Sequence, residues 1–149
     1  MNPKYIVVGV FSLGIFVVVY ENVWTGSPRE PNPHSVQVAP GEAGAALATV
    51  AVPGLSPKAE AGRIAFEANC ATCHGVNAAG QDGTAPPLVH RIYEPNHHGD
   101  AAFQLAVKNG VRAHHWHFGN MPPVPGVSEQ DVDKIIAYVR ALQKANGIF

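Results

Sequence analysis

The sequence has little cysteine and no excess of charge of either sign. Cysteine occurs only twice in 149 residues, at positions 70 and 73, which excludes a scaffold held together by several disulfides. The 10 basic and 11 acidic residues nearly cancel. This balance argues against a nucleic-acid partner, because nucleic-acid binding favours a basic surface. No segment alternates apolar and polar residues as a half-buried strand does, so no sheet is predicted.

Residues arranged for catalysis are also missing. No general acid–base pair, nucleophile triad or phosphate-binding loop stands out, and Asp82 and Glu94 are isolated acidic residues in predicted loops. The glycines at positions 75–83 do not follow a strand, so they are interpreted as turn residues. The sequence therefore predicts a protein that is not an enzyme.

Residues 1–24 contain a long apolar run that predicts a transmembrane anchor. A helix needs about 20 apolar residues to cross a bilayer core, and Tyr5, Tyr20 and Trp24 stand where interfacial aromatics occur. Lys4 leaves this end in the cytoplasm by the positive-inside rule, so the chain crosses the lipid bilayer once. A cleaved signal peptide is the alternative, although no small-residue cleavage site follows Tyr20. Either interpretation places the remaining residues outside the cytoplasm.

Residues 25–55 are rich in proline, alanine and glycine and predict a linker. The prolines interrupt helices and central strands, so we expect an extended tether. An apolar stretch at 45–52 leaves a second arrangement open, in which it packs on the following domain or forms a short helix.

Residues 56–149 predict one small all-α domain with three main helices. The first runs over 57–69, with Ser56 as its cap. The second has Asp100 as its cap and ends at Gly110. Three short helices with long loops form a poor core, and a large flat apolar cofactor would complete it.

The third helix has the clearest signals. Ser128 caps it, Gly147 ends it, and Arg140 and Lys144 favour its negative end. Its apolar residues recur at the spacing of one buried helical face: Val132, Ile135, Ile136, Val139 and Leu142.

Residues 70–74 form the pattern Cys-x-x-Cys-His, which is typical of haem c attachment. Thiols three positions apart at a helix end reach both vinyl groups of one porphyrin. We therefore predict one haem c, bound through thioethers at Cys70 and Cys73, with His74 as an axial ligand of the iron. Two alternatives stay open. A thioredoxin-like dithiol would sit near a βαβ pattern, and a zinc site needs four ligands.

Met121 is the candidate for the opposite axial ligand. It is the only methionine besides Met1, and it lies in a proline-flanked loop where a flexible core filler is unexpected. Its thioether is a soft ligand that raises the potential of a haem iron. Two alternatives are that Met121 only packs or lies on the surface, and that a histidine from positions 114, 115 and 117 is the ligand.

Residues 57–149 resemble a class I, mitochondrial-like cytochrome c domain. Gly62 and Phe66 match the glycine and aromatic of that family's first helix, and Tyr138 matches the aromatic of its last. The resemblance implies three main helices around one haem, with Gly62 permitting a close helix crossing. The anchor and tether resemble those of membrane-anchored bacterial cytochromes c.

Two loop motifs extend the resemblance. Residues 85–88 are similar to the family's Gly-Pro-x-Leu, with Ala85 in place of the usual glycine. The resemblance implies that the Pro86 carbonyl accepts a hydrogen bond from His74 Nδ1 and that Leu88 packs on the haem. Residues 120–122 are similar to the family's distal Met-Pro, which supports Met121.

A haem iron with His and Met ligands has no open position, which favours electron transfer over substrate binding. We expect a carrier of single electrons between respiratory or photosynthetic partners: a quinol-oxidising complex and a terminal oxidase, or a dehydrogenase. It would lie on the periplasmic side of a bacterial inner membrane. The alternatives are a stable subunit of a larger oxidoreductase, a ligand-binding haem protein and a copper-linked haem protein.

Two histidine clusters stand apart from these motifs, one at positions 97 and 98 and one at 114, 115 and 117. Three interpretations stay open: solvated loop residues, a second metal site for which imidazole suggests copper, and a pH-sensitive docking or propionate contact.

Overall fold

The computed structural model describes Tyr20 and residues 41–149. The predicted anchor over 1–24, Tyr20 excepted, and the first part of the predicted linker, 25–40, lie outside the described residues. In the part of the chain that is described, no helix combines the length and the apolar character needed to cross a membrane.

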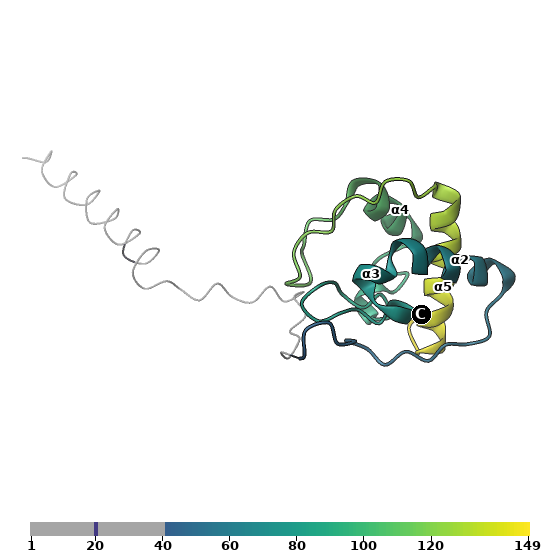
Figure 1. Cartoon of the computed structure of the whole chain (residues 1–149), viewed down its shortest axis with the longest axis horizontal. Helices are drawn as coiled ribbons and strands as arrows, with labels where there is room; N and C mark the ends of the chain where they lie inside the picture. Colours follow the sequence, from purple (N-terminus) through teal and green to yellow (C-terminus); the bar gives the residue numbers. More distant parts are fainter. Residues whose placement is uncertain (1–19, 21–40) are drawn as a thin grey trace, which may run out of the picture. The chain divides into compact units, whose positions relative to one another are not determined.

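The described residues form helices joined by long loops (Figure 1). They contain no strand, only two isolated β-bridges, so the predicted all-α class is confirmed. In chain order, the elements are α2 (Pro57–Asn69), α3 (Ala71–His74), η2 (Val76–Ala78), η3 (Arg91–Tyr93), α4 (Asp100–Asn109) and α5 (Glu129–Ala145).

The helix ends follow the capping signals with one difference. The Ser56 side chain accepts a hydrogen bond from the Ala59 N–H, and Ser128 accepts one from the Asp131 N–H. Asp100, however, is not the cap of α4. Gly99 takes that position, and Asp100 is the first residue of the helix.

The core of the domain is the crossing of α2 and α5, which lie side by side in Figure 1. At the crossing, a Cβ added to Gly62 would stand 1.9 Å from the Lys134 carbonyl oxygen, so the close approach requires glycine. The Phe66 and Tyr138 rings meet nearby, with centroids 5.6 Å apart. The close helix crossing that the resemblance implies is therefore present.

The apolar face predicted for the last helix is buried, because its five residues are each at most 5% exposed. Three of them join a larger apolar cluster to which the loops also contribute. Its members are Phe66, Ala78, Val89, Ile135, Tyr138, Val139, Leu142 and Ile148.

Arg140 acts differently from the sequence prediction, which placed it at the negative end of the last helix. Its guanidinium donates to the Tyr93 and His98 carbonyl oxygens, both at 2.6 Å, and pairs with Asp100 at 2.9 Å. A mid-helix side chain reaches these groups because the chain before α4 packs against α5. Arg140 therefore holds the segment from Tyr93 to Asp100 in place.

Gln143 is a buried polar residue, 1% exposed. Its Nε2 donates to the Leu88 carbonyl oxygen at 2.8 Å and to the Tyr93 carbonyl oxygen at 3.0 Å. The Tyr93 carbonyl also has Arg140 as a donor, so of these two acceptors only the Leu88 carbonyl depends on Gln143.

Replacing Gln143 with leucine should leave the partly buried Leu88 carbonyl without its donor. We expect the free energy of unfolding to fall by about 1–3 kcal/mol, the cost of one orphaned buried polar group. Urea unfolding followed by circular dichroism measures this. Gln104→Leu is the control, because its bonds to Glu129 and Asp133 are exposed. Equal losses in the two variants would contradict the assignment.

Residues 41–55, the described part of the predicted linker, lie against the domain. The Gly44 N–H donates to the Asp82 carbonyl, and the Asp82 N–H donates to the Ala45 carbonyl, at 3.0 and 2.8 Å. Farther along, Ala51 exchanges two hydrogen bonds with the Asn146 side chain, each 2.9 Å long. Of the two arrangements that the sequence left open, packing on the domain is the one observed here, and no helix forms in this segment.

Candidate functional site

The two cysteines lie at a single helical turn, with Cys70 just before α3 and Cys73 within it. Cys70 ends α2, where its N–H donates to the Phe66 carbonyl at 2.8 Å. The Cys70 carbonyl then accepts from the N–H groups of Cys73 and His74, at 3.1 and 2.9 Å. Both cysteines are free thiols, Cys70 half-buried and Cys73 exposed. The two thiols are therefore carried by one short segment at the junction of α2 and α3.

Neither alternative interpretation of the cysteines gains support. Burial raises the pKa of the Cys70 thiol to about 11, and the neighbouring Cys73 adds to the shift. A disulfide-exchanging dithiol needs the opposite, a lowered thiol pKa. Among the described residues, the group able to surround a metal ion consists of histidines and includes neither cysteine.

His74 is oriented by the Pro86 carbonyl. The distance from His74 Nδ1 to the Pro86 oxygen is 2.9 Å, the contact that the resemblance implies. With the proton held at Nδ1, the lone pair lies on Nε2, where it can bind a metal. Burial lowers the pKa of His74, against the opposing effect of the Pro86 hydrogen bond. The imidazole is therefore neutral at neutral pH, as a ligand must be.

The loop that carries Pro86 folds back under α3. The Gly80 N–H donates to the His74 carbonyl at 2.7 Å, and a Cβ on Gly80 would lie 2.5 Å from Pro87 N. Gly80 also has a φ of 75°, which favours glycine. The Gln81 side chain then donates to the carbonyls of Ala71 and Thr72 at 3.2 and 3.0 Å. These bonds fix Pro86 relative to α3.

Ala85, the departure from the family's glycine, is accommodated. It is 7% exposed and exchanges two backbone hydrogen bonds with Gln81. It is not among the described residues with positive φ, so its backbone does not require glycine. Leu88 is half-buried and packs against the apolar core cluster.

Met121 has a rigidly held backbone. It pairs with Val111 through two backbone hydrogen bonds of 2.9 Å each. A Cβ on Gly110 would lie 2.5 Å from the Met121 carbonyl oxygen, so a side chain there would displace Met121. The Asn120 side chain accepts from the Ala113 N–H at 2.9 Å, which closes the intervening loop. Met121 itself is half-buried.

The histidines between Val111 and Met121 do not act as one group. The ring of His115 faces His97, and the ring of His114 lies beside that of His115 at a tilt of 50°, with centroids 4.1 Å apart. His117 is exposed and does not belong to the group able to surround a metal ion. The structure thus places His115, from the second predicted cluster, next to His97, from the first.

Trp116 was not assigned a role from sequence. Its indole N–H is buried and has no hydrogen-bond partner among the described residues. Trp116 lies close enough to Tyr93 to oppose the rise that burial causes in the pKa of that phenol, but the pair does not meet hydrogen-bond geometry. Buried tryptophan N–H groups normally find an acceptor. An anionic group on a bound cofactor would supply one here.

These residues fit a covalently held haem. Two free thiols stand one helical turn apart, a neutral histidine follows with its Nε2 lone pair available, and a buried N–H lacks an acceptor. The family model for cytochrome c matches residues 59–143, a range that includes all of these groups and Met121.

The chain belongs to the cytochrome c family. Such a domain carries covalently bound haem c, typically one per domain, and is an electron carrier. This agrees with the single Cys-x-x-Cys-His pattern and supports the class I resemblance of residues 57–149. Comparison of this cytochrome with curated proteins and with solved structures gave no match.

Proposed function

We propose that this cytochrome carries single electrons through a haem ligated by His74 and Met121. The observation that carries the proposal is the His74 Nδ1 to Pro86 hydrogen bond of 2.9 Å, which leaves the Nε2 lone pair available to ligate an iron. Met121 supports the proposal because it is the only methionine outside position 1. Its N–H and its carbonyl are both hydrogen-bonded to the backbone of Val111.

The chain's own residues keep both ligands in place. When bound, the haem supplies an iron that exchanges one electron. The Pro86 carbonyl prevents rotation of the His74 ring, and the bridge to Val111 prevents displacement of the Met121 backbone. Ligands that do not move on a change of charge favour outer-sphere electron transfer, and a closed coordination sphere disfavours substrate binding.

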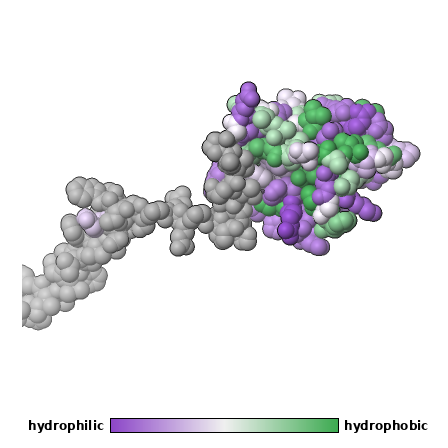
Figure 2. All heavy atoms as spheres, turned by 90° about the horizontal axis from the view of Figure 1, so that it is seen from below, coloured by the Kyte–Doolittle hydropathy of each residue, from purple (hydrophilic) through white to green (hydrophobic). Residues whose placement is uncertain are grey.

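The surface beside the attachment turn suits a transient partner. Cys73 is exposed, and Val76, two residues beyond His74, is 73% exposed. Apolar residues appear among polar ones on the face shown in Figure 2. An exposed apolar side chain such as Val76 beside the turn supports the brief docking that redox encounters require.

The proposed membrane anchor explains how such weak docking suffices. Residues 1–24 would hold the domain at the periplasmic face of a bacterial inner membrane, raising its effective concentration near a quinol-oxidising complex, a terminal oxidase or a dehydrogenase. Because residues 41–55 lie on the domain, the tether would be limited to residues 25–40. Such a stretch spans at most about 55 Å when fully extended.

An optical spectrum of the haem-loaded full chain tests the ligation. We expect a thioether-to-ferric charge-transfer band in the oxidised protein and no spectral shift when the reduced protein is exposed to carbon monoxide. The band requires Met121 at the iron, and the absence of a shift requires that both axial positions are filled. A prompt carbon monoxide shift would overturn the proposal in favour of a ligand-binding haem.

A further inference from the structure

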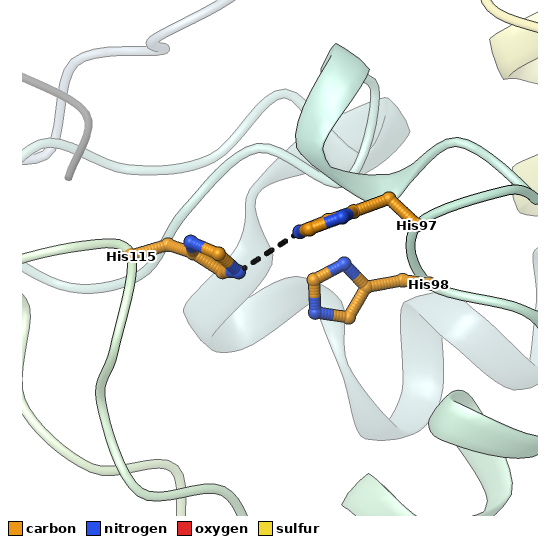
Figure 3. Close-up of side chains that lie close together, drawn as sticks. All are labelled: His97, His98 and His115. Carbon is orange, nitrogen blue, oxygen red and sulfur yellow. Dashed lines mark hydrogen bonds between the residues drawn. The ribbon is translucent and has the colours of Figure 1, made fainter. Parts of the chain in front are cut away.

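Three imidazoles from two separate segments converge at one place (Figure 3). His97 and His98 come from the turn that precedes α4, and His115 comes from the loop between Val111 and Met121. One nitrogen from each ring can be chosen so that all three lie within 4.8 Å of one another. Figure 3 shows the three rings facing a common centre, with His97 and His115 joined by the dashed line.

Hydrogen bonds fix the turn that carries His97 and His98 without a bound ion. The N–H groups of His97 and His98 both donate to the Glu94 carbonyl, at 3.0 and 2.8 Å. His98 Nδ1 lies 2.6 Å from the Ile92 carbonyl oxygen, so the proton sits on Nδ1 and the lone pair on Nε2. This is the arrangement in which a protein carbonyl orients a metal-binding histidine.

The spacing of two of the nitrogens matches a metal centre. His97 Nε2 and His115 Nε2 are 3.3 Å apart. Two nitrogens bound to one zinc ion at about 2.0–2.1 Å with a tetrahedral angle stand about 3.3 Å apart. Without an ion, one of the two nitrogens must carry the proton that the other accepts. A metal ion would replace that proton with little movement of the rings.

His114 stands beside this trio as a fourth candidate. Its ring centroid is 4.1 Å from that of His115 and 5.9 Å from that of His98. His114 Nδ1 lies 2.8 Å from the Arg112 carbonyl oxygen, which again leaves the lone pair on Nε2. Its place beside His115 makes this exposed side chain a candidate for a fourth ligand.

The donor type selects the class of ion. The cluster offers imidazole nitrogen, and among the described residues no carboxylate belongs to it. Imidazole suits zinc and copper, whereas calcium and magnesium require oxygen ligands. Burial, opposed by the Ile92 hydrogen bond, lowers the pKa of His98, and the neighbouring imidazoles lower it further. The exposed side of His97 leaves a path for entry.

We propose that His97, His98 and His115, joined by His114, bind one divalent transition-metal ion, zinc or copper. The ion would tie the turn before α4 to the loop that ends at Met121 and so stiffen that loop. Any effect of the ion on Met121 as an iron ligand rests on the proposed function, but binding of the ion does not.

Calorimetry on the full chain, matured with haem and stripped by a chelator, tests the site. Haem attachment occupies Cys70 and Cys73, so they do not compete for the added ion. Zinc chloride and copper(II) chloride are titrated separately, and we expect one ion per chain from at least one of them. Their relative affinities identify the ion. No stoichiometric binding of either metal would overturn the proposal.

Variants show whether the binding uses these side chains. His97→Gln and His115→Gln should each weaken binding by roughly tenfold or more, because removal of a ligand costs at least as much as removal of its outer-shell partner. His117→Gln in the same loop is the matched control and should bind as the wild type does. Equal affinity in all three variants would overturn the site.

A spectroscopic readout keeps the test independent of variant folding. Electron paramagnetic resonance of the copper(II)-loaded wild type should show hyperfine coupling to three or four imidazole nitrogens. Coupling to fewer than three would overturn the assignment. Neither result depends on the carbon monoxide spectrum, so failure of the metal site and failure of the proposed His/Met ligation are separate outcomes.

Discussion

Replacing Met121 with alanine should lower the reduction potential of the haem by on the order of 0.1 V or more. Axial ligands set haem potentials over a range of about 0.8 V, and a thioether ligand raises the potential relative to harder donors. The variant should also lose the thioether-to-ferric band and bind carbon monoxide when reduced. A spectroelectrochemical titration of the full chain measures the potential.

Val111→Ala is the control for this experiment. Val111 holds Met121 through backbone groups, which alanine retains. The reduction potential of the Val111→Ala variant should therefore stay close to that of the wild type. If Met121→Ala leaves the potential unchanged, the thioether is not the ligand. His114, His115 and His117, substituted one at a time, would then show which imidazole takes its place.

Replacing Gly62 with alanine should prevent the domain from folding to a stable state. The new Cβ would lie 1.9 Å from the Lys134 carbonyl oxygen and 2.4 Å from its carbon, both backbone atoms of α5. Overpacking typically costs about 1–3 kcal/mol where side chains can yield. Here the helices must separate, so we expect a loss of stability of more than about 3 kcal/mol. Thermal unfolding by circular dichroism and the yield of haem-loaded protein measure it.

At an uncrowded helix position, replacing glycine with alanine stabilises a protein by up to about 1 kcal/mol. A loss of stability in Gly62→Ala therefore reports the helix contact and not helix propensity. Ile64→Ala, two residues along α2, is the control. Ile64 is 58% exposed, so its removal should change stability by no more than about 0.5 kcal/mol. A stable Gly62→Ala protein would mean that α2 and α5 cross farther apart than the structure has them.

The sequence by itself determined those parts of the protein that depend on residues close together in the chain. The starts of α2 and α5 follow from Ser56 and Ser128, whose side chains cap N–H groups three residues away. The buried face of α5 follows from helical periodicity alone. The Cys-x-x-Cys-His pattern is equally local, because a single helical turn brings both thiols and the histidine together.

Only the tertiary structure decided which distant groups meet. His97 and His115 are 18 positions apart, and the sequence presents them as members of two separate clusters. Arg140 looked like a helix-end charge, yet it binds carbonyl groups 42 and 47 positions away. Composition suggested that residues 41–55 form a tether, whereas backbone hydrogen bonds hold them on the domain.

The physical reason is that caps and periodicity act over one or two helical turns, whereas these contacts depend on where loops are placed. The α2–α5 crossing and hydrogen bonds to backbone carbonyl groups, such as that of Glu94, position the loops. The pattern of side chains in the sequence does not predict such backbone bonds. The Trp116 N–H shows the same limit, since its lack of a partner becomes visible only when its surroundings are known. Local chemistry thus determined the attachment turn, and long-range packing decided what surrounds it.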